Sequence, residues 1–142
     1  MNGFDFLDFA KSLLSSSNEA ARRTSVSRSY YAIYHQMKEI LTSLGIPVSR
    51  QPSEHQRLVR YLKEGGKNAG IQNASRYGEF FDSLREERNN ADYDLSVQKF
   101  NERNCKLQWR VAEMIYNIIN ANLVEYKRSF VNYAKRINEY HS

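Results

Sequence analysis

The segment from Ser27 to His35, SRSYYAIYH, brings together an arginine, three tyrosines and one of the three histidines in the chain. Histidine transfers protons near neutral pH, and arginine binds phosphate through its planar guanidinium group. Aromatic rings stack on nucleobases. These residue types favour a site for a nucleotide or RNA, on the condition that a helix holds their side chains on one face.

Helical spacing divides this segment between two faces. With about 100° per residue, the apolar side chains form one stripe that should face the core: Val26, Tyr30, Ile33, Met37, Ile40 and Leu44. Arg28, Tyr31 and His35 lie nearly opposite that stripe, on a face that Thr24 and Thr42 extend. Outer helix faces usually carry lysine and glutamate. We therefore expect the short helix, a second copy of the chain or a ligand to cover this aromatic face, and an ordinary structural role for Tyr31 and His35 stays an alternative.

The composition indicates one domain covering residues 1–142. The formal net charge of +5 favours polyanionic partners. Cys105 is the single cysteine, and the three histidines stand at no spacing typical of zinc, so we expect neither a metal nor a cofactor. No apolar run approaches the roughly 20 residues of a membrane span. Acidic residues at Asp5 and Asp8 argue against a signal peptide, so we expect a soluble, cytoplasmic protein without membrane contact.

Apolar residues recur at helical spacing through most of the chain, and alternating β-branched runs are absent. We expect an all-α fold, an up-and-down four-helix bundle with an additional short helix. The expected helices cover residues 4–14, 16–44, 53 to about 64, 74–91, and 96 or 97 onward, with residues 125–142 as a C-terminal helical extension.

Three local signals set the expected boundaries. Capping boxes, Ser16 with Glu19 and Ser53 with Gln56, should begin the second and third helices. Gly65–Gly70 is the best loop in the chain, and it lacks the context of a phosphate-binding loop. The expected core positions outside the second helix are Phe6, Phe9, Ala10 and Leu13 in the first helix and Phe100, Leu107, Val111, Met114, Ile115, Ile118 and Leu123 in the last.

Two segments together resemble the signatures of HEPN domains, the higher eukaryote and prokaryote nucleotide-binding family. SRSYYAIYH resembles the first signature, and REERNNADYD, from Arg85 to Asp94, resembles the second, an arginine followed by Ala-Asp-Tyr. The resemblance covers roughly Phe4 to Val124. It implies a helical bundle, usually a homodimer with a groove near the second signature, that binds a nucleotide or RNA. Relatives often act as toxins or in phage defence, frequently beside a minimal nucleotidyltransferase partner protein.

Many relatives are metal-independent ribonucleases in which a histidine follows an arginine after four to six residues. This chain departs from that pattern, because the positions after Arg88 that should offer histidine are Tyr93, Asp94 and Leu95. Arg28 and His35 match the spacing, but 13 arginines make such matches frequent by chance. In a ribonuclease, histidine would move protons and arginine would stabilise the phosphorane.

Three functions follow as hypotheses. The leading one is a HEPN-type nucleotide- or RNA-binding domain in a toxin–antitoxin or phage-defence setting. Its binding surface would consist of Arg28, Tyr31, His35, Arg85, Arg88, Asp92 and Tyr93. The second is a metal-independent endoribonuclease toxin, with Arg88 on the phosphate and His35 as the proton carrier. The third is a non-enzymatic module for dimerisation or for a partner such as a nucleotidyltransferase.

Overall fold

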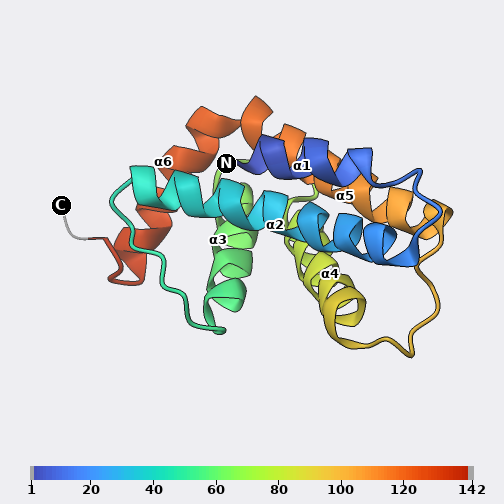
Figure 1. Cartoon of the computed structure of the whole chain (residues 1–142). Coiled ribbons are helices and arrows are strands. Elements are labelled where there is room, and N and C mark those ends of the chain that lie inside the picture. The colour runs from blue at the N-terminus through green and yellow to red at the C-terminus, as the bar shows by residue number, and fades with distance from the viewer. Residues whose placement is uncertain (1, 141–142) are drawn as a thin grey trace.

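The computed structural model describes residues 2–140, and the regular structure in this range is entirely helical. The helices are α1 (Gly3–Ser12), α2 (Glu19–Ser43), α3 (Glu54–Asn68), α4 (Ala74–Tyr93), α5 (Glu102–Ala121) and α6 (Leu123–Arg136). The predicted all-α fold is thus confirmed. In Figure 1, α1 and α5 run beside the long α2, and the α3–α4 hairpin is steeply inclined to it. No helix in the described range is long and apolar enough to cross a bilayer.

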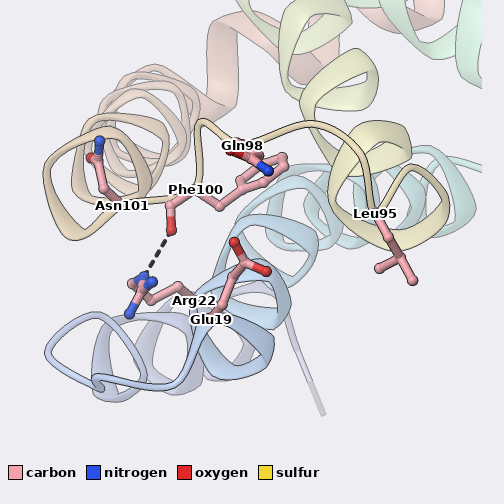
Figure 2. A pocket seen from close by; sticks show the side chains of 6 residues that line it. All are labelled: Glu19, Arg22, Leu95, Gln98, Phe100 and Asn101. Atoms are coloured by element: carbon pink, nitrogen blue, oxygen red, sulfur yellow. Dashed lines mark hydrogen bonds between the residues drawn. The ribbon is translucent and has the colours of Figure 1, made fainter.

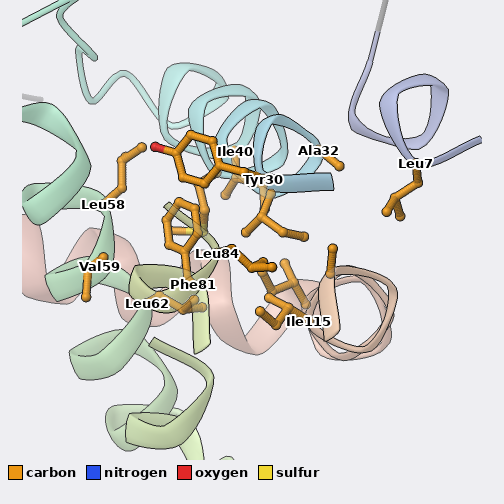
Figure 3. Packing of buried hydrophobic residues seen from close by; sticks show 14 of the residues in the cluster. Leu7, Tyr30, Ala32, Ile40, Leu58, Val59, Leu62, Phe81, Leu84 and Ile115 are labelled. Carbon is orange, nitrogen blue, oxygen red and sulfur yellow. The ribbon is translucent and has the colours of Figure 1, made fainter. Parts of the chain in front are cut away.

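The apolar stripe of α2 forms the centre of the core, as its spacing predicts. Five of its six side chains are buried, and Leu44, which follows the helix, is half-buried. Figure 3 shows Tyr30 against Phe81 of α4, and the two rings stack with centroids 5.6 Å apart. The Tyr30 hydroxyl lies on the side of α3, at the edge of this cluster.

The predicted core face of α1 is confirmed for Ala10, wrong for Phe9, and only half-buried at Phe6 and Leu13. The buried residues are Gly3, Leu7 and Ala10, whereas Phe9 is exposed and Phe6 is only half-buried. The reason is close packing: a Cβ on Gly3 would lie 2.6 Å from the carbonyl oxygen of Ala32, so only a glycine fits where α1 meets α2. The face with small residues therefore turns inward.

The two predicted capping boxes do not form. Asn18 caps α2 by accepting a hydrogen bond from the backbone N–H of Ala20 at 2.8 Å, and Ser16 lies outside the helix. Ser53 does precede α3, but its backbone is helical (φ −65°, ψ −15°) and its side chain accepts no capping hydrogen bond. A capping side chain needs an extended backbone, which Asn18 has and Ser53 lacks.

The glycine-rich stretch is mostly helix rather than loop, contrary to the prediction. α3 continues to Asn68, and Gly65 and Gly66 are buried within it. A Cβ on Gly65 would lie 2.3 Å from the ring of Phe130 in α6, and one on Gly66 would lie 2.4 Å from the Cβ of Ala74 in α4. These glycines allow neighbouring helices to approach α3 closely, and that contact outweighs their low helix propensity.

The last predicted helix starts later and breaks once. α5 begins at Glu102, capped by Asn101, and a break at Asn122 separates it from α6. Residues 94–101 stay non-helical because Arg22 and Arg23 of α2 donate hydrogen bonds to their backbone carbonyls. Of the core positions predicted here, Phe100 and Ile115 are buried, Leu107 is exposed and the others are half-buried. The buried residues of α5 are Cys105, Trp109, Ala112, Ile115 and Ile119.

Candidate functional site

A cleft of about 410 Å³ opens between α2, α3, α4 and the loop 44–53. Four cationic side chains, two histidines and three tyrosines surround it. They are Lys38, Arg50, Arg85 and Arg88, then His35 and His55, then Tyr30, Tyr31 and Tyr34, with Gln51 and Pro52 completing the lining. Among the described residues, no carboxylate belongs to this lining. The cleft is therefore positively charged and aromatic.

Arg88 is held by the aromatic side chains around it. It donates hydrogen bonds to the hydroxyls of Tyr31 and, at 3.4 Å, Tyr93. Its guanidinium lies over the Tyr31 ring at 5.1 Å and over the Tyr93 ring at 5.3 Å. Arg88 Nε lies 3.1 Å from Asp92 Oδ2, which also accepts from the hydroxyl of Ser27. The structure thus brings together four predicted site residues and leaves Arg88 partly neutralised.

Arg85 lies nearly one helical turn before Arg88 and lines the same cleft without a partner. Within residues 2–140 its guanidinium makes no hydrogen bond or ion pair with the protein, and the same holds for Arg50 and Lys38. Side-chain cations that converge on a cleft without acceptors attract an anion. These three cations supply charge that the protein itself does not neutralise.

His35 lines the cleft beneath a ring from α1. The Phe6 ring stacks on it with centroids 4.7 Å apart and an interplanar angle of 13°. Burial lowers the pKa of His35, and the Lys38 and Arg28 cations lower it further, so the imidazole is neutral at pH 7. Arg28 lies 6.0 Å from the ring centroids of Phe6 and Tyr31, outside the lining. Part of the aromatic face of α2 is therefore covered by α1.

The seven predicted binding residues divide into two groups. Tyr31, His35, Arg85 and Arg88 line the cleft. Arg28, Asp92 and Tyr93 do not line it, and they contact residues that do.

The sequence prediction missed a polar chain at the base of the cleft. Tyr30 Oη lies 2.9 Å from His55 Nδ1, and His55 Nε2 lies 3.0 Å from Asp82 Oδ1. Burial lowers the pKa of His55, its hydrogen bond with Asp82 opposes that effect, and the charge of Arg85 adds to it. His55 shares the helical spacing of the buried Leu58, and that spacing was the available sign that it faces inward.

The sequence analysis also did not predict that the loop 44–53 supplies Arg50 to the cleft. Hydrogen bonds to Glu54 of α3 hold this loop in place. Glu54 accepts hydrogen bonds from the backbone N–H of Ser49 at 2.9 Å and from its hydroxyl at 2.6 Å. Although burial raises the pKa of Glu54, these bonds and the Arg57 cation lower it overall. Arg57 also donates to Glu139 Oε1 at 2.8 Å. A network of buried or half-buried groups therefore connects the loop to the C-terminal segment.

A second hollow, between the start of α2 and the loop 94–101, lacks these properties. Figure 2 shows Arg22 there, with its Nε donating to the Phe100 carbonyl oxygen at 2.7 Å. Its Nη1 donates to the Ser16 carbonyl oxygen at 3.1 Å. The carboxylate of Glu19 lines the same hollow. Because its cation is satisfied and a carboxylate is present, this hollow does not suit an anion.

Metal binding has no evident position in the described range: no group of three or more His, Cys, Asp or Glu side chains there is arranged to hold an ion. In comparisons with known proteins, the profile of the HEPN domain family matches residues 2–122. Neither the curated proteins nor the solved structures contain a significant match to the chain.

Proposed function

Because the chain belongs to the HEPN domain family, we propose that its cleft binds a nucleotide unit, either as a free nucleotide or within single-stranded RNA. One observation carries this proposal: the cleft gathers four cations and five aromatic or imidazole rings, and no carboxylate of the described residues lines it. A phosphate group would neutralise these cations, and a nucleobase would stack on the aromatic rings.

The proposed contacts follow from which side chains are free. Arg85, Arg50 and Lys38 bind the phosphate, because they have no acceptor in the described protein. Tyr34 is half-buried beside His35, at 5.5 Å between ring centroids, and offers a stacking surface for a base. Arg88 adds positive charge from its fixed position between Tyr31 and Asp92.

Fluorescence anisotropy with a short labelled single-stranded RNA at low salt tests this proposal, with unlabelled ATP as the competitor that separates the two ligand sources. We expect Arg85→Ala to weaken binding about tenfold or more, because it removes a charged hydrogen-bond donor to phosphate. Arg128→Ala is the matched control: it removes an exposed arginine of α6 that lies outside the cleft. Folded protein that binds neither probe would contradict the proposal.

A metal-independent ribonuclease is the second candidate, in the toxin–antitoxin or phage-defence setting that the family resemblance favours. It is supported by His35 and Arg88 lining one cleft although they lie far apart in the sequence. Neutral His35 can take the proton of the 2′-hydroxyl as its oxygen attacks phosphorus, and can return it to the 5′-oxygen that leaves. Arg88 can stabilise the negative charge on the phosphorane oxygens. Cleavage of RNA in EDTA should be lost in His35→Ala and in Arg88→Ala. Equal cleavage by both variants would indicate a contaminating nuclease.

The third candidate, a module for dimerisation or for a nucleotidyltransferase partner, is supported by the exposed position of Tyr93 beside the cleft. Light scattering should then show that Tyr93→Ala changes the oligomeric state. An unchanged oligomeric state with weakened RNA binding would favour the nucleotide-binding function instead.

A further inference from the structure

The hydrogen-bonded chain at the base of the cleft connects a ligand site to an exposed carboxylate. It runs from Tyr30 of α2 through His55 of α3 to Asp82 of α4. Tyr30 and His55 are both buried and both line the cleft, whereas the Asp82 side chain is about half exposed. Three helices thus fix the two ring nitrogens of one histidine between two partners of different chemistry.

When His55 is neutral, its two hydrogen-bond partners determine which ring nitrogen carries the proton. Ionised Asp82 only accepts hydrogen bonds, so His55 Nε2 must carry the proton and donate it. His55 Nδ1 then has a lone pair and accepts from the Tyr30 hydroxyl. In this state the only proton of the Tyr30 hydroxyl is directed at His55, and the hydroxyl oxygen offers lone pairs to the cleft. A lone pair repels a phosphate oxygen.

Protonation of His55 reverses the direction of its hydrogen bond with the Tyr30 hydroxyl. Both ring nitrogens of an imidazolium are donors, so Nδ1–H donates to the Tyr30 oxygen and Nε2–H still donates to Asp82. The Tyr30 proton is then free to point into the cleft. One added proton therefore converts Tyr30 from a group that repels an anion into one that binds it.

We propose that binding of a phosphodiester in this cleft is linked to the uptake of one proton by His55, after which the Tyr30 hydroxyl donates a hydrogen bond to the bound phosphate. The proposal rests on the nucleotide-binding function above and specifies how that site is regulated. It makes His55 a positioning residue, because His55 acts on the ligand through Tyr30.

Most charges around His55 oppose its protonation in the free protein, which makes that protonation sensitive to a bound anion. From α4, Asp82 stabilises the imidazolium and Arg85 destabilises it. From α2, the neighbouring hydroxyl is that of Tyr30, and the pKa of Tyr30 is raised mainly by burial, so it stays protonated. The remaining cations of the lining, Lys38, Arg50 and Arg88, also oppose a further positive charge, and Glu54 on α3 itself is engaged by Ser49 and Arg57.

An anion bound to Arg85 removes the main repulsion that His55 experiences from the cleft. In the free protein, burial and Arg85 hold the pKa of His55 below its ordinary value. A bound phosphodiester raises that pKa, so a proton is taken up on binding wherever the pH lies between the free and bound values. Affinity should therefore rise as the pH falls from about 7.5 through this window.

Calorimetry measures this linkage directly. The probe is a short single-stranded RNA with hydroxyl groups at both ends, because a terminal phosphate itself titrates near pH 6. The heat of binding, measured at constant ionic strength in buffers of different ionisation enthalpy, gives the number of protons taken up. We expect uptake that approaches one proton and an affinity that rises by up to about tenfold per pH unit.

Variants assign the proton. His55→Gln should remove proton uptake. Tyr30→Phe keeps the stacked ring but removes the hydroxyl that donates to the phosphate, so it should reduce the gain in affinity at low pH. Tyr126→Phe is the matched control, since it deletes a buried hydroxyl that has no hydrogen-bond partner within residues 2–140. Its pH dependence should equal that of the parent.

Three results would overturn the proposal. Binding that is independent of pH would disprove the linkage and leave the nucleotide-binding function intact. Loss of proton uptake in His35→Gln, with uptake retained in His55→Gln, would assign the proton to His35. The absence of any binding between pH 5 and 7.5 would remove both the proposed function and this inference.

Discussion

Two arginines of neighbouring helices, Arg23 and Arg85, show how differently one residue type is used in this molecule. Arg23 of α2 is buried, and its guanidinium donates to four backbone carbonyls at the end of α4 and in the loop that follows: Asn90 at 3.2 Å, Ala91 at 3.2 Å, Asp94 at 3.0 Å and Val97 at 2.6 Å. Arg85 of α4 is half-buried in the cleft and donates to no group of the described protein.

The two arginines differ in the source of the groups that accept their hydrogen bonds. Arg23 also lies 4.5 Å from the Phe100 ring, and its cation faces the C-terminal end of a helix, where carbonyl groups concentrate negative charge. The chain itself thus completes the Arg23 site. A half-buried guanidinium without acceptors loses hydration and gains nothing from the fold, so Arg85 costs stability until a ligand supplies the acceptors.

The largest effect should come from removing Arg23. We expect Arg23→Ala to reduce the free energy of unfolding by about 3 kcal/mol or more, because four partly or fully buried carbonyls lose a charged donor together. Urea denaturation measures this loss. Arg23→Lys keeps the charge with fewer donors and should recover part of it. A loss below about 1 kcal/mol for Arg23→Ala would show that water replaces the guanidinium.

Arg85→Ala should have the opposite profile. Its free energy of unfolding should stay within about 0.5 kcal/mol of the parent or rise, since the guanidinium makes no hydrogen bond or ion pair with the described residues. The RNA affinity should nevertheless fall about tenfold or more. Denaturation and anisotropy on one preparation separate the two quantities. A large loss of stability would place Arg85 in the same structural class as Arg23.

The salt dependence of RNA binding should show how many of the cleft cations that lack a partner in the described protein contact phosphate. For single-stranded RNA, the slope of log K against log salt is negative, and its magnitude falls by about 0.7 for each phosphate contact removed. We expect this decrease for Arg50→Ala and for Lys38→Ala, and no decrease for Arg128→Ala. Anisotropy titrations at several salt concentrations give the slopes. Equal slopes in all three variants would mean that neither Lys38 nor Arg50 contacts phosphate.

The smallest effect should come from Glu139, which acts on the cleft only through the loop 44–53. Glu139→Gln replaces a carboxylate by a neutral amide. It should weaken the hydrogen bonds that Glu139 accepts from Arg57 and, at 2.8 Å, from the Tyr61 hydroxyl. We expect a loss of about 1 kcal/mol in unfolding free energy and a decrease of about threefold or less in affinity. Glu125→Gln, an exposed change on α6, is the control. An unaltered affinity with reduced stability would show that the loop holds Arg50 without Glu139.

Helical periodicity predicts the fold class, and four of the residues proposed for a binding surface, Tyr31, His35, Arg85 and Arg88, line the cleft. Helical periodicity fixes which face of α2 is buried, and it therefore predicts that Arg28, Tyr31 and His35 share the opposite face. Where periodicity was weak, glycine and serine signals misled. Gly65 is typical of a loop in the sequence, but in the fold the Phe130 ring, 65 positions later, occupies the space that a side chain at Gly65 would fill.

The acid–base chain could not be predicted, because spacing within one helix shows which side chains face inward and not which residues of other helices they meet. Tyr30, His55 and Asp82 lie on three different helices, and only the packing of the α3–α4 hairpin against α2 brings them together. Tyr30 was correctly assigned to the core through its ring, yet that assignment says nothing about its hydroxyl. A residue on a core stripe can thus still present a polar atom to a site.

The network from Glu139 through Arg57 and Glu54 to Ser49 has a consequence for motion. It joins the segment after α6 to the loop that carries Arg50, so the order of one depends on the order of the other. Coupling of this kind is reciprocal. A ligand that immobilises Arg50 must therefore also restrain the C-terminal segment, and backbone amides near Glu139 should exchange with deuterium more slowly in the complex, although no ligand atom touches them.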